Sequence, residues 1–147
     1  MAGTSQIVMD ASVILKWFIP EEFDEDADGV KDRFASGELD ILVPELLYHE
    51  VTNVLRYKPG YSVQDLEQCA ESLYGMQLNT IHWDNDLDKS AINLAFKYGL
   101  TIYDSAYLAI TEMLDCRFVT CDDKMITKIG ENELIIHLKD LDYGTND

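Results

Sequence analysis

Short apolar segments alternate with stretches of helical periodicity, and this alternation limits the possible folds more than any other feature of the chain. The segments that predict strands are Ile7–Met9, Ile41–Val43, Arg117–Thr120 and Leu134–His137, with a further short extended piece within Met76–Trp83. The segments that predict helices are Ala11–Ile19, Asp24–Phe34, Pro44–Arg56, Ser62–Gly75, Leu87–Tyr98, Ser105–Leu114 and Met125–Ile129. Strands that alternate with helices indicate an α/β fold with a mostly parallel sheet.

The length and composition predict one globular domain over residues 1–147, with residues 143–147 as a loose tail. No apolar segment approaches the ~20 residues that a membrane-spanning helix requires. The first residues lack the basic region followed by an apolar stretch that marks a secretory signal. The three cysteines have neither zinc-site nor disulfide-framework spacing. These features predict a cytoplasmic protein with reduced cysteines and no membrane association.

Three aspartates occur where a parallel sheet would present ligands. Asp10 and Asp122 come just after predicted strands, and Asp104 stands at the start of a nearly apolar helix. Ligands of parallel sheets bind beyond the carboxyl ends of the strands. Each aspartate could instead serve as a helix N-cap, for which Asp is a preferred residue, and the two roles are compatible. Asp123 follows Asp122 directly, so the spacing leaves open which of the two belongs to the set.

Glu50 has no capping role, because it lies in the middle of its predicted helix. At about 100° per residue it projects between Leu46 and Val54, within the apolar arc, and Asn53 lies at the edge of that arc. A carboxylate that faces a core is costly unless it is paired or bound to a metal. The alternative to a metal site at Glu50 is therefore a buried ion pair with a lysine or an arginine.

The oxygen ligands of this set are those that Mg²⁺ and Mn²⁺ prefer, because these hard cations bind a few carboxylates together with water and phosphate oxygens. Ser12 and Thr120 each lie two residues from an acid, where a hydroxyl can orient a carboxylate or bind a metal water, although local helix capping is an equal alternative. The chain contains no GxGxxG, GxxxxGK[ST] or GxSxG motif, which excludes the nucleotide-binding loops and serine hydrolases that these motifs mark. The candidate metal-site residues are Asp10, Glu50, Asp104 and Asp122.

The formal net charge of −17, from 28 acidic and 11 basic residues, is unusual for a protein that binds nucleic acid. Six of the eight residues of Glu21–Asp28 are acidic, which predicts a solvated loop and helix start. Any bound RNA must therefore be held by bound cations and a small basic patch. The candidates for that patch are Lys16, Arg56, Lys58, Lys124 and Lys128.

Four segments of the chain, in order, resemble the PIN-domain family, and more narrowly the toxins of VapBC-type toxin–antitoxin pairs. These segments are Val8–Val13, Pro44–Leu55, Leu100–Ala109 and Phe118–Asp122. The resemblance implies a Rossmann-like α/β/α sandwich around a short, mostly parallel sheet, and a Mg²⁺- or Mn²⁺-dependent endoribonuclease. It implies that the four acids form the metal site, with Asp10 and Asp104 as direct ligands. The positions that match supporting polar groups of the family are Ser12, Asn53 and Thr120.

The resemblance also implies the partners of the protein. Toxins of this kind commonly form homodimers, act on RNA, and are silenced by a small antitoxin whose tail fills the active-site groove. Bound divalent ions would polarise the scissile phosphate and lower the pKa of a water molecule, and we expect products with 5′-phosphate and 3′-hydroxyl ends. Two alternatives remain open: a PIN-fold nuclease of RNA processing or turnover, and a catalytically silent module whose acidic surface recruits a basic partner.

Overall fold

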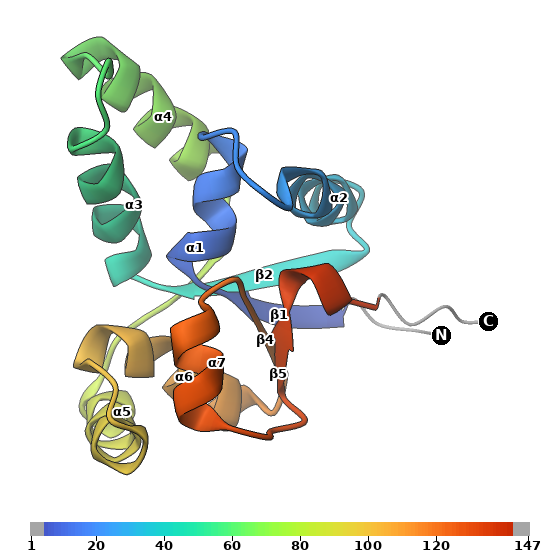
Figure 1. Cartoon of the computed structure of the whole chain (residues 1–147), viewed down its shortest axis with the longest axis vertical. Coiled ribbons are helices and arrows are strands. Elements are labelled where there is room, and N and C mark those ends of the chain that lie inside the picture. Colours follow the sequence, from blue (N-terminus) through green and yellow to red (C-terminus); the bar gives the residue numbers. More distant parts are fainter. Residues whose placement is uncertain (1–4, 143–147) are drawn as a thin grey trace.

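The computed structural model describes residues 5–142 and contains one five-stranded sheet with the strand order β3-β2-β1-β4-β5 (Figure 1). All four strand pairs are parallel. The strands are β1 (Ser5–Met9), β2 (Leu39–Pro44), β3 (Asn79–Ile81), β4 (Arg117–Thr120) and β5 (Ile135–His137). The predicted α/β fold with a mostly parallel sheet is confirmed. The predicted loose tail, residues 143–147, lies outside the described residues.

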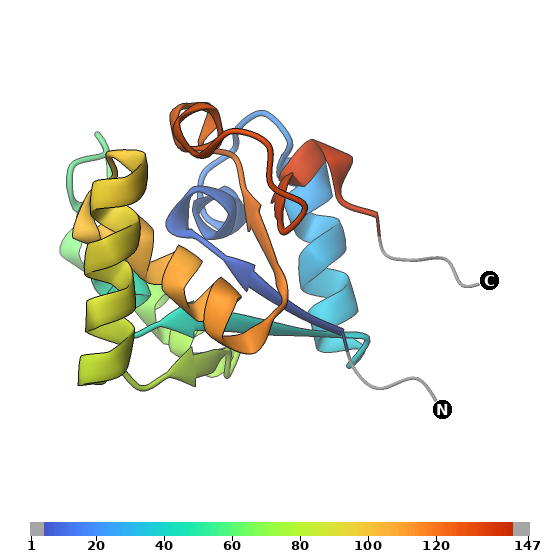
Figure 2. The same ribbon diagram turned by 90° about the horizontal axis from the view of Figure 1, so that it is seen from below.

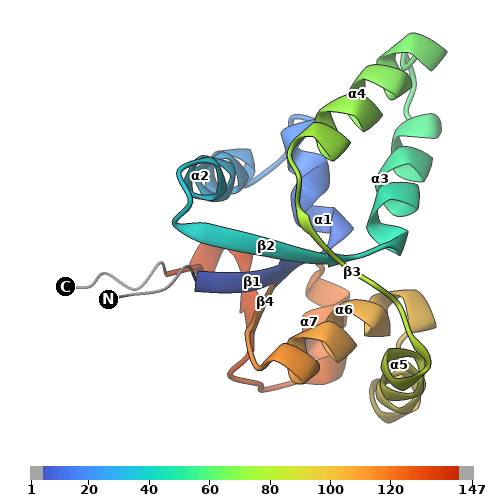
Figure 3. The same ribbon diagram turned by 180° about the vertical axis from the view of Figure 1, so that it is seen from behind.

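The helices cover both faces of the sheet. They are α1 (Ala11–Ile14), α2 (Asp24–Ala35), α3 (Leu46–Arg56), α4 (Val63–Gly75), α5 (Asn85–Tyr98), α6 (Ile102–Leu114) and α7 (Asp123–Ile129), with 3₁₀ turns η1 (Leu15–Trp17) and η2 (Leu138–Asp140). Helices α5 and α6 pack side by side (Figure 2). They lie on one side of β1 and β2, and α1 to α4 lie on the other (Figure 3). This is the predicted α/β/α arrangement. No helix within residues 5–142 is long and apolar enough to cross a membrane.

Several helix ends follow the sequence signals. Ser62 and Asp65 form a capping box at the start of α4, in which each side chain accepts a hydrogen bond from the backbone N–H of the other residue. Gly99 ends α5 in the left-handed conformation that glycine adopts without a steric penalty. The acidic segment becomes the first turn of α2, where Asp24 and its acidic neighbours face the positive end of the helix dipole.

Two of the predicted helical segments include residues that are not α-helical in the structure. The segment Ala11–Ile19 is α-helical only in α1 and continues as the 3₁₀ turn η1. Helical geometry ends before Ile19, where the following Pro20 disfavours it. Pro44 was expected at the first helical position of the Glu50 helix, which is wrong. It is the last residue of β2 and pairs with Ile81 of β3. A proline at a strand end removes only a terminal hydrogen bond from the sheet.

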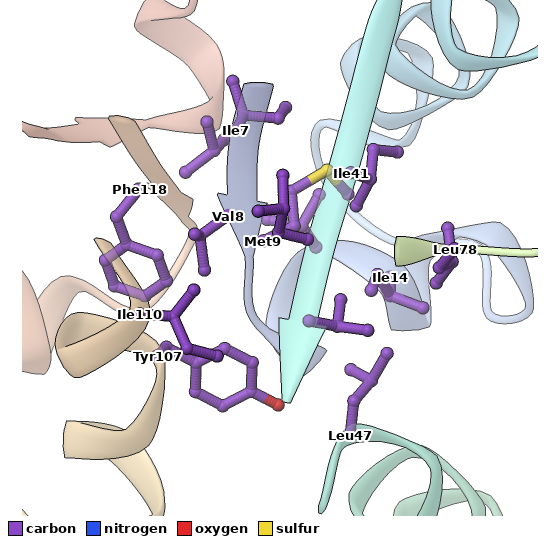
Figure 4. Packing of buried hydrophobic residues seen from close by; sticks show 14 of the residues in the cluster. Ile7, Val8, Met9, Ile14, Ile41, Leu47, Leu78, Tyr107, Ile110 and Phe118 are labelled. Atoms are coloured by element: carbon purple, nitrogen blue, oxygen red, sulfur yellow. The ribbon is translucent and has the colours of Figure 1, made fainter. Parts of the chain in front are cut away.

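The core lies on both faces of β1 and β2. Ile7, Val8 and Met9 are buried, as a strand covered by helices on both sides requires (Figure 4). On the α6 side, the rings of Tyr107 and Phe118 stack with their centroids 6.1 Å apart. Figure 4 shows the Tyr107 hydroxyl near the end of the β2 arrow. The chain beyond the carboxyl ends of β1 and β4 carries Asp10 and Asp122, two of the four acidic residues described next.

Candidate metal centre

Asp10 is the most buried of the four acids, with 7% of its surface exposed. It follows the last residue of β1, and two hydroxyls hold its carboxylate. Ser12 Oγ donates to Oδ1 over 2.6 Å, and Thr120 Oγ1 donates to Oδ2 over 2.5 Å. Burial raises the pKa of Asp10 from 3.8 to about 6, with a further contribution from Asp122, although the two hydrogen bonds favour the ionised form.

The same two hydroxyls connect Asp10 to the segment that enters α7. The backbone N–H of Cys121 donates to Ser12 Oγ, and that of Asp122 donates to Thr120 Oγ1, each over 3.0 Å. Each hydroxyl therefore donates a hydrogen bond to the Asp10 carboxylate and accepts one from a backbone N–H of the segment that joins β4 to α7. The expected orientation of a carboxylate by these hydroxyls is present. The capping alternative is wrong for both, because the N-cap residues of α1 and α7 are Asp10 and Asp122.

Glu50 lies in the middle of α3 and is half-buried, as its place in the apolar arc predicts. The hydroxyl of Tyr107 in α6 donates to its Oε1 over 2.5 Å. No lysine or arginine among residues 5–142 forms an ion pair with Glu50, so the ion-pair alternative is wrong. The pKa of Glu50 is raised from 4.5 to about 7, mainly by burial. The hydrogen bond from Tyr107 opposes this rise, and the charges of Asp10 and Asp104 add to it.

Tyr107 is not among the predicted site residues, although its hydroxyl contacts Glu50. Its ring is buried. Burial and the nearby Glu50 charge raise the pKa of the phenol, so the phenol is the donor in this bond. A signal was present in the sequence, because a buried tyrosine hydroxyl requires a partner. Tyr107 also lies three residues after Asp104 and therefore on the same side of α6.

Asp104 lies inside the first turn of α6, and its carboxylate does not cap the helix. The N-cap residue is Thr101, whose Oγ1 accepts a hydrogen bond from the backbone N–H of Asp104 over 3.0 Å. The capping alternative is therefore wrong for the Asp104 side chain. Burial, followed by the charge of Asp122, raises the pKa of Asp104, and the nearby Lys128 lowers it. The carboxylate remains available to a ligand.

Asp122 is the N-cap of α7, and its Oδ1 accepts a hydrogen bond from the backbone N–H of Met125 over 3.1 Å. The capping alternative is confirmed here, and it leaves one carboxylate oxygen outside the cap bond. Asp123 has a side chain that is 88% exposed and that faces His137, with 3.7 Å between Oδ1 and Nε2. Asp122 raises the pKa of both Asp10 and Asp104. The structure therefore groups Asp122, and not Asp123, with the other acids.

Replacing Asp123 by asparagine consequently tests the assignment of the fourth acid. We expect the Asp123→Asn protein to keep its activity within about twofold, because an exposed substitution typically changes free energies by less than about 0.5 kcal/mol. Metal-dependent cleavage rates of the Asp123→Asn and Asp122→Asn proteins, measured side by side, check this. A large loss in the Asp123 variant alone would reverse the assignment.

The four carboxylates form one electrostatic group at the carboxyl edge of the sheet. The charge of Asp122 raises the pKa values of Asp10 and Asp104, and the charges of these two residues raise the pKa of Glu50. Within residues 5–142, no three Asp, Glu, His or Cys side chains are spaced so that they could hold a metal ion as they stand. The donor set still fits Mg²⁺ or Mn²⁺, since these ions take few carboxylates and keep several waters. Like charges also repel one another until a cation compensates them.

The remaining predicted residues lie around this group. Asn53 is exposed and lines a groove with Glu50. Two members of the predicted basic patch have partners within the protein: Lys16 pairs with Glu21 over 3.7 Å, and Lys128 Nζ donates to the carbonyl oxygen of Gly99 over 3.2 Å. The charge of Lys128 lowers the pKa of Asp104, so this lysine lies close enough to the acidic group to affect it.

The PIN-domain family model matches residues 7–132. The chain therefore belongs to the PIN-domain family, as the resemblance of its four segments implied. It is similar to Ribonuclease VapC3 from Pyrobaculum aerophilum, with 30% identity over 130 residues that cover 84% of this chain and 94% of that protein.

Solved structures with the same fold include two with low sequence identity. One is a toxin–antitoxin complex from Klebsiella pneumoniae, with a TM-score of 0.67, 12% identity, and coverage of 90% of this chain and 97% of that chain. The other is VapC20 from Mycobacterium tuberculosis, a toxin that cleaves the sarcin–ricin loop, with a TM-score of 0.64, 15% identity, and coverage of 86% and 97%. At these identities the likeness shows the fold alone.

Proposed function

We propose that the protein is a Mg²⁺- or Mn²⁺-dependent endoribonuclease that acts as the toxin of a toxin–antitoxin pair in the cytoplasm. The observation that carries the proposal is the group of four carboxylates at the carboxyl edge of the sheet, in which the pKa values of Asp10, Glu50 and Asp104 are all raised. Perturbed carboxyl groups that act on one another mark functional sites. The relationship to a ribonuclease and the fold shared with toxins support the assignment.

Asp10 and Asp104 would be the direct ligands of the metal ion, with Glu50 and Asp122 beside them. The bound ion would polarise the scissile phosphate and lower the pKa of the attacking water. Ser12 and Thr120 keep the Asp10 carboxylate in one orientation through their hydroxyl hydrogen bonds. Glu50 has a pKa of about 7, so its carboxylate can take up a proton near neutral pH. Tyr107 fixes the Oε1 atom of that carboxylate.

The test is cleavage of a mixed panel of RNAs with Mg²⁺, with Mn²⁺ and with EDTA, followed by analysis of the product ends. We expect cleavage that requires a divalent ion and leaves 5′-phosphate and 3′-hydroxyl ends. Cleavage in EDTA, or products with 2′,3′-cyclic phosphate, would contradict the proposal, because the cyclic product uses the RNA 2′-hydroxyl as nucleophile. If the protein is instead a catalytically silent binding module, no RNA in the panel should be cleaved in a metal-dependent way.

The toxin role and its partners require a separate experiment in cells. Expression of the protein is expected to arrest growth, whereas expression of the Asp104→Asn variant is not. A small antitoxin protein, co-expressed with the toxin, should restore growth, and the toxin should purify as a homodimer. Cleavage in vitro without growth arrest would support the alternative of a nuclease in RNA processing.

A further inference from the structure

Lys128 lies near the end of α7, and its side chain contacts the turn that joins α5 to α6. Its Nζ atom donates a hydrogen bond to the carbonyl oxygen of Gly99 over 3.2 Å. Gly99 is the C-cap residue of α5, so the ammonium lies at the negative end of that helix dipole. The contact holds a cation at the turn that leads to Asp104, the proposed metal ligand in the first turn of α6.

This lysine acts on one half of the acidic group. Its helix begins at the N-cap residue Asp122, and the turn that it contacts leads to Asp104. The charge of Lys128 lowers the pKa of Asp104, whereas burial and the charge of Asp122 raise it. The charges that shift the pKa values of Asp10 and Glu50 are those of other acids. The ammonium therefore lies beside Asp104, on the α7 side of the group.

Most of the hydrogen-bonding capacity of this ammonium is not used by the protein. Lys128 is exposed, and within residues 5–142 no carboxylate forms an ion pair with it. A lysine ammonium has three N–H donors, and the Gly99 carbonyl takes one of them. Lys16 differs, because 8% of its side chain is exposed and its ammonium pairs with Glu21. The remaining donors of Lys128 are available to a ligand that enters from solvent.

The acidic group needs further positive charge before it can accept a phosphate. When all four carboxylates are ionised, one divalent ion compensates only half of their charge. A phosphate of RNA that approaches the ion then still meets net negative charge. An ammonium beside the group lowers this repulsion, and its N–H donors form charge-assisted hydrogen bonds, which are stronger than neutral ones. Lys128 has both the position and the available donors for that contact.

We propose that Lys128 binds an oxygen of the scissile phosphate from the α7 side of the candidate metal centre. The inference rests on the proposed ribonuclease function and adds a catalytic residue to it. The lysine binds the phosphate as an ammonium and transfers no proton. A lysine that contacts a reacting phosphate stabilises the negative charge of its oxygens in the transition state. The phosphate therefore meets positive charge from two directions, the bound ion and α7.

The first test is the rate of RNA cleavage by Lys128→Gln, which loses the charge and keeps an N–H donor. We expect kcat/KM to fall roughly 10- to 150-fold, the range for loss of a hydrogen bond to a charged group. Lys128→Arg keeps the charge and is expected to retain most of the activity. Lys89→Gln removes an exposed lysine of α5 and is the matched control, with activity expected within about twofold of wild type.

The affinity for Mn²⁺ without RNA separates this role from a structural one, and EPR spectra of the free ion measure it. Loss of a neighbouring positive charge is expected to leave Mn²⁺ binding by Lys128→Gln unchanged or to strengthen it by up to about fivefold. If Lys128 instead only held α7 against the α5–α6 turn, its loss would displace the acids. Mn²⁺ binding would then weaken together with cleavage.

Three results would overturn the proposal. These are unchanged cleavage by Lys128→Gln, Mn²⁺ binding that weakens in parallel with cleavage, and a Lys128→Arg protein that is as slow as Lys128→Gln. Thermal unfolding curves verify that each variant is folded. The proposed function fails in a different way: a wild-type protein that cleaves no RNA would refute both, whereas a Lys128→Gln protein that cleaves at the wild-type rate would refute this inference alone.

Discussion

The Asp104→Asn protein is expected to stay folded and to cleave RNA about 10²- to 10³-fold more slowly than the wild-type protein, the loss typical of removing one preorganised charge from a catalytic site. Asp104 is one of the two proposed direct ligands, and an asparagine brings no negative charge to the metal ion. The α6 N-cap is preserved, because it uses the backbone N–H of residue 104 and the side chain of Thr101. The carboxylate itself is half-buried among like charges, so its removal relieves repulsion.

The matched control for this variant is Asp115→Asn, at the other end of the same helix. Asp115 is exposed and has a φ of 49°, a left-handed conformation that asparagine adopts about as readily as aspartate. Both variants lose one negative charge from α6, but only Asp104 belongs to the acidic group. Initial cleavage rates and thermal unfolding curves of the three proteins complete the experiment. An unfolded Asp104→Asn protein would refute the interpretation of this residue as functional and not structural.

Stability without metal is expected to fall as the pH rises from 5 to 8. Burial raises the pKa of Asp10 to about 6 and that of Glu50 to about 7, so the folded chain retains protons that the unfolded chain has already released. Under this condition the free energy of unfolding decreases with pH. The penalty is absent below the ordinary carboxyl pKa values and fully present above the raised ones. For the buried Asp10 it amounts to about 3 kcal/mol, and for the partly exposed Glu50 to about 1–2 kcal/mol after solvent screening.

Glu50→Gln isolates this effect from the general charge of the chain. The amide oxygen of glutamine can still accept the hydrogen bond of Tyr107, while the charge is lost. We expect the variant to melt roughly 2–8 °C higher than wild type at pH 8, from about 1–2 kcal/mol at about 2–4 °C per kcal/mol for a chain of this size. Most of this gain should disappear at pH 5. The exposed Glu67→Gln on α4 removes one charge elsewhere and should show no such pH-dependent gain.

Mg²⁺ provides a second check on the same carboxylates. At pH 8 the ion should raise the melting temperature of wild type more than that of Glu50→Gln, because a ligand that binds only the folded state stabilises it. Equal melting temperatures of wild type and Glu50→Gln at pH 8 would mean that the negative charge of Glu50 does not destabilise the folded state.

The order of elements and the parallel sheet could be predicted because short apolar strands and capped helices leave local signals. The same signals placed Asp10 and Asp122 beyond strand ends and Glu50 within an apolar arc. The structure brings these acids together, and their chemical role as ligands remains a prediction. Where a local pattern was compatible with two structures or two roles, the choice depended on contacts with residues that are distant in the sequence.

Pro44 and Tyr107 show why those choices required the fold. Proline suits both a helix start and a strand end, and the pairing with Ile81 of β3 decides between them. Tyr107 fits an apolar helix equally well as a core ring or as a hydrogen-bond donor. Its partner Glu50 is 57 positions away in sequence and meets it only after α3 and α6 have both packed on the sheet. Contacts of this kind leave no periodic trace in the sequence.

The bond between Asp10 and Thr120 joins residues 110 positions apart, and so links the first strand of the described chain to the fourth. During translation, a chain that has emerged only as far as α6 carries Asp10 and Glu50 but still lacks the hydroxyl of β4 and the fourth acid. The group of four acidic residues is therefore incomplete until most of the polypeptide has left the ribosome. A chain at that stage therefore lacks part of the acidic group on which the proposed ribonuclease activity depends.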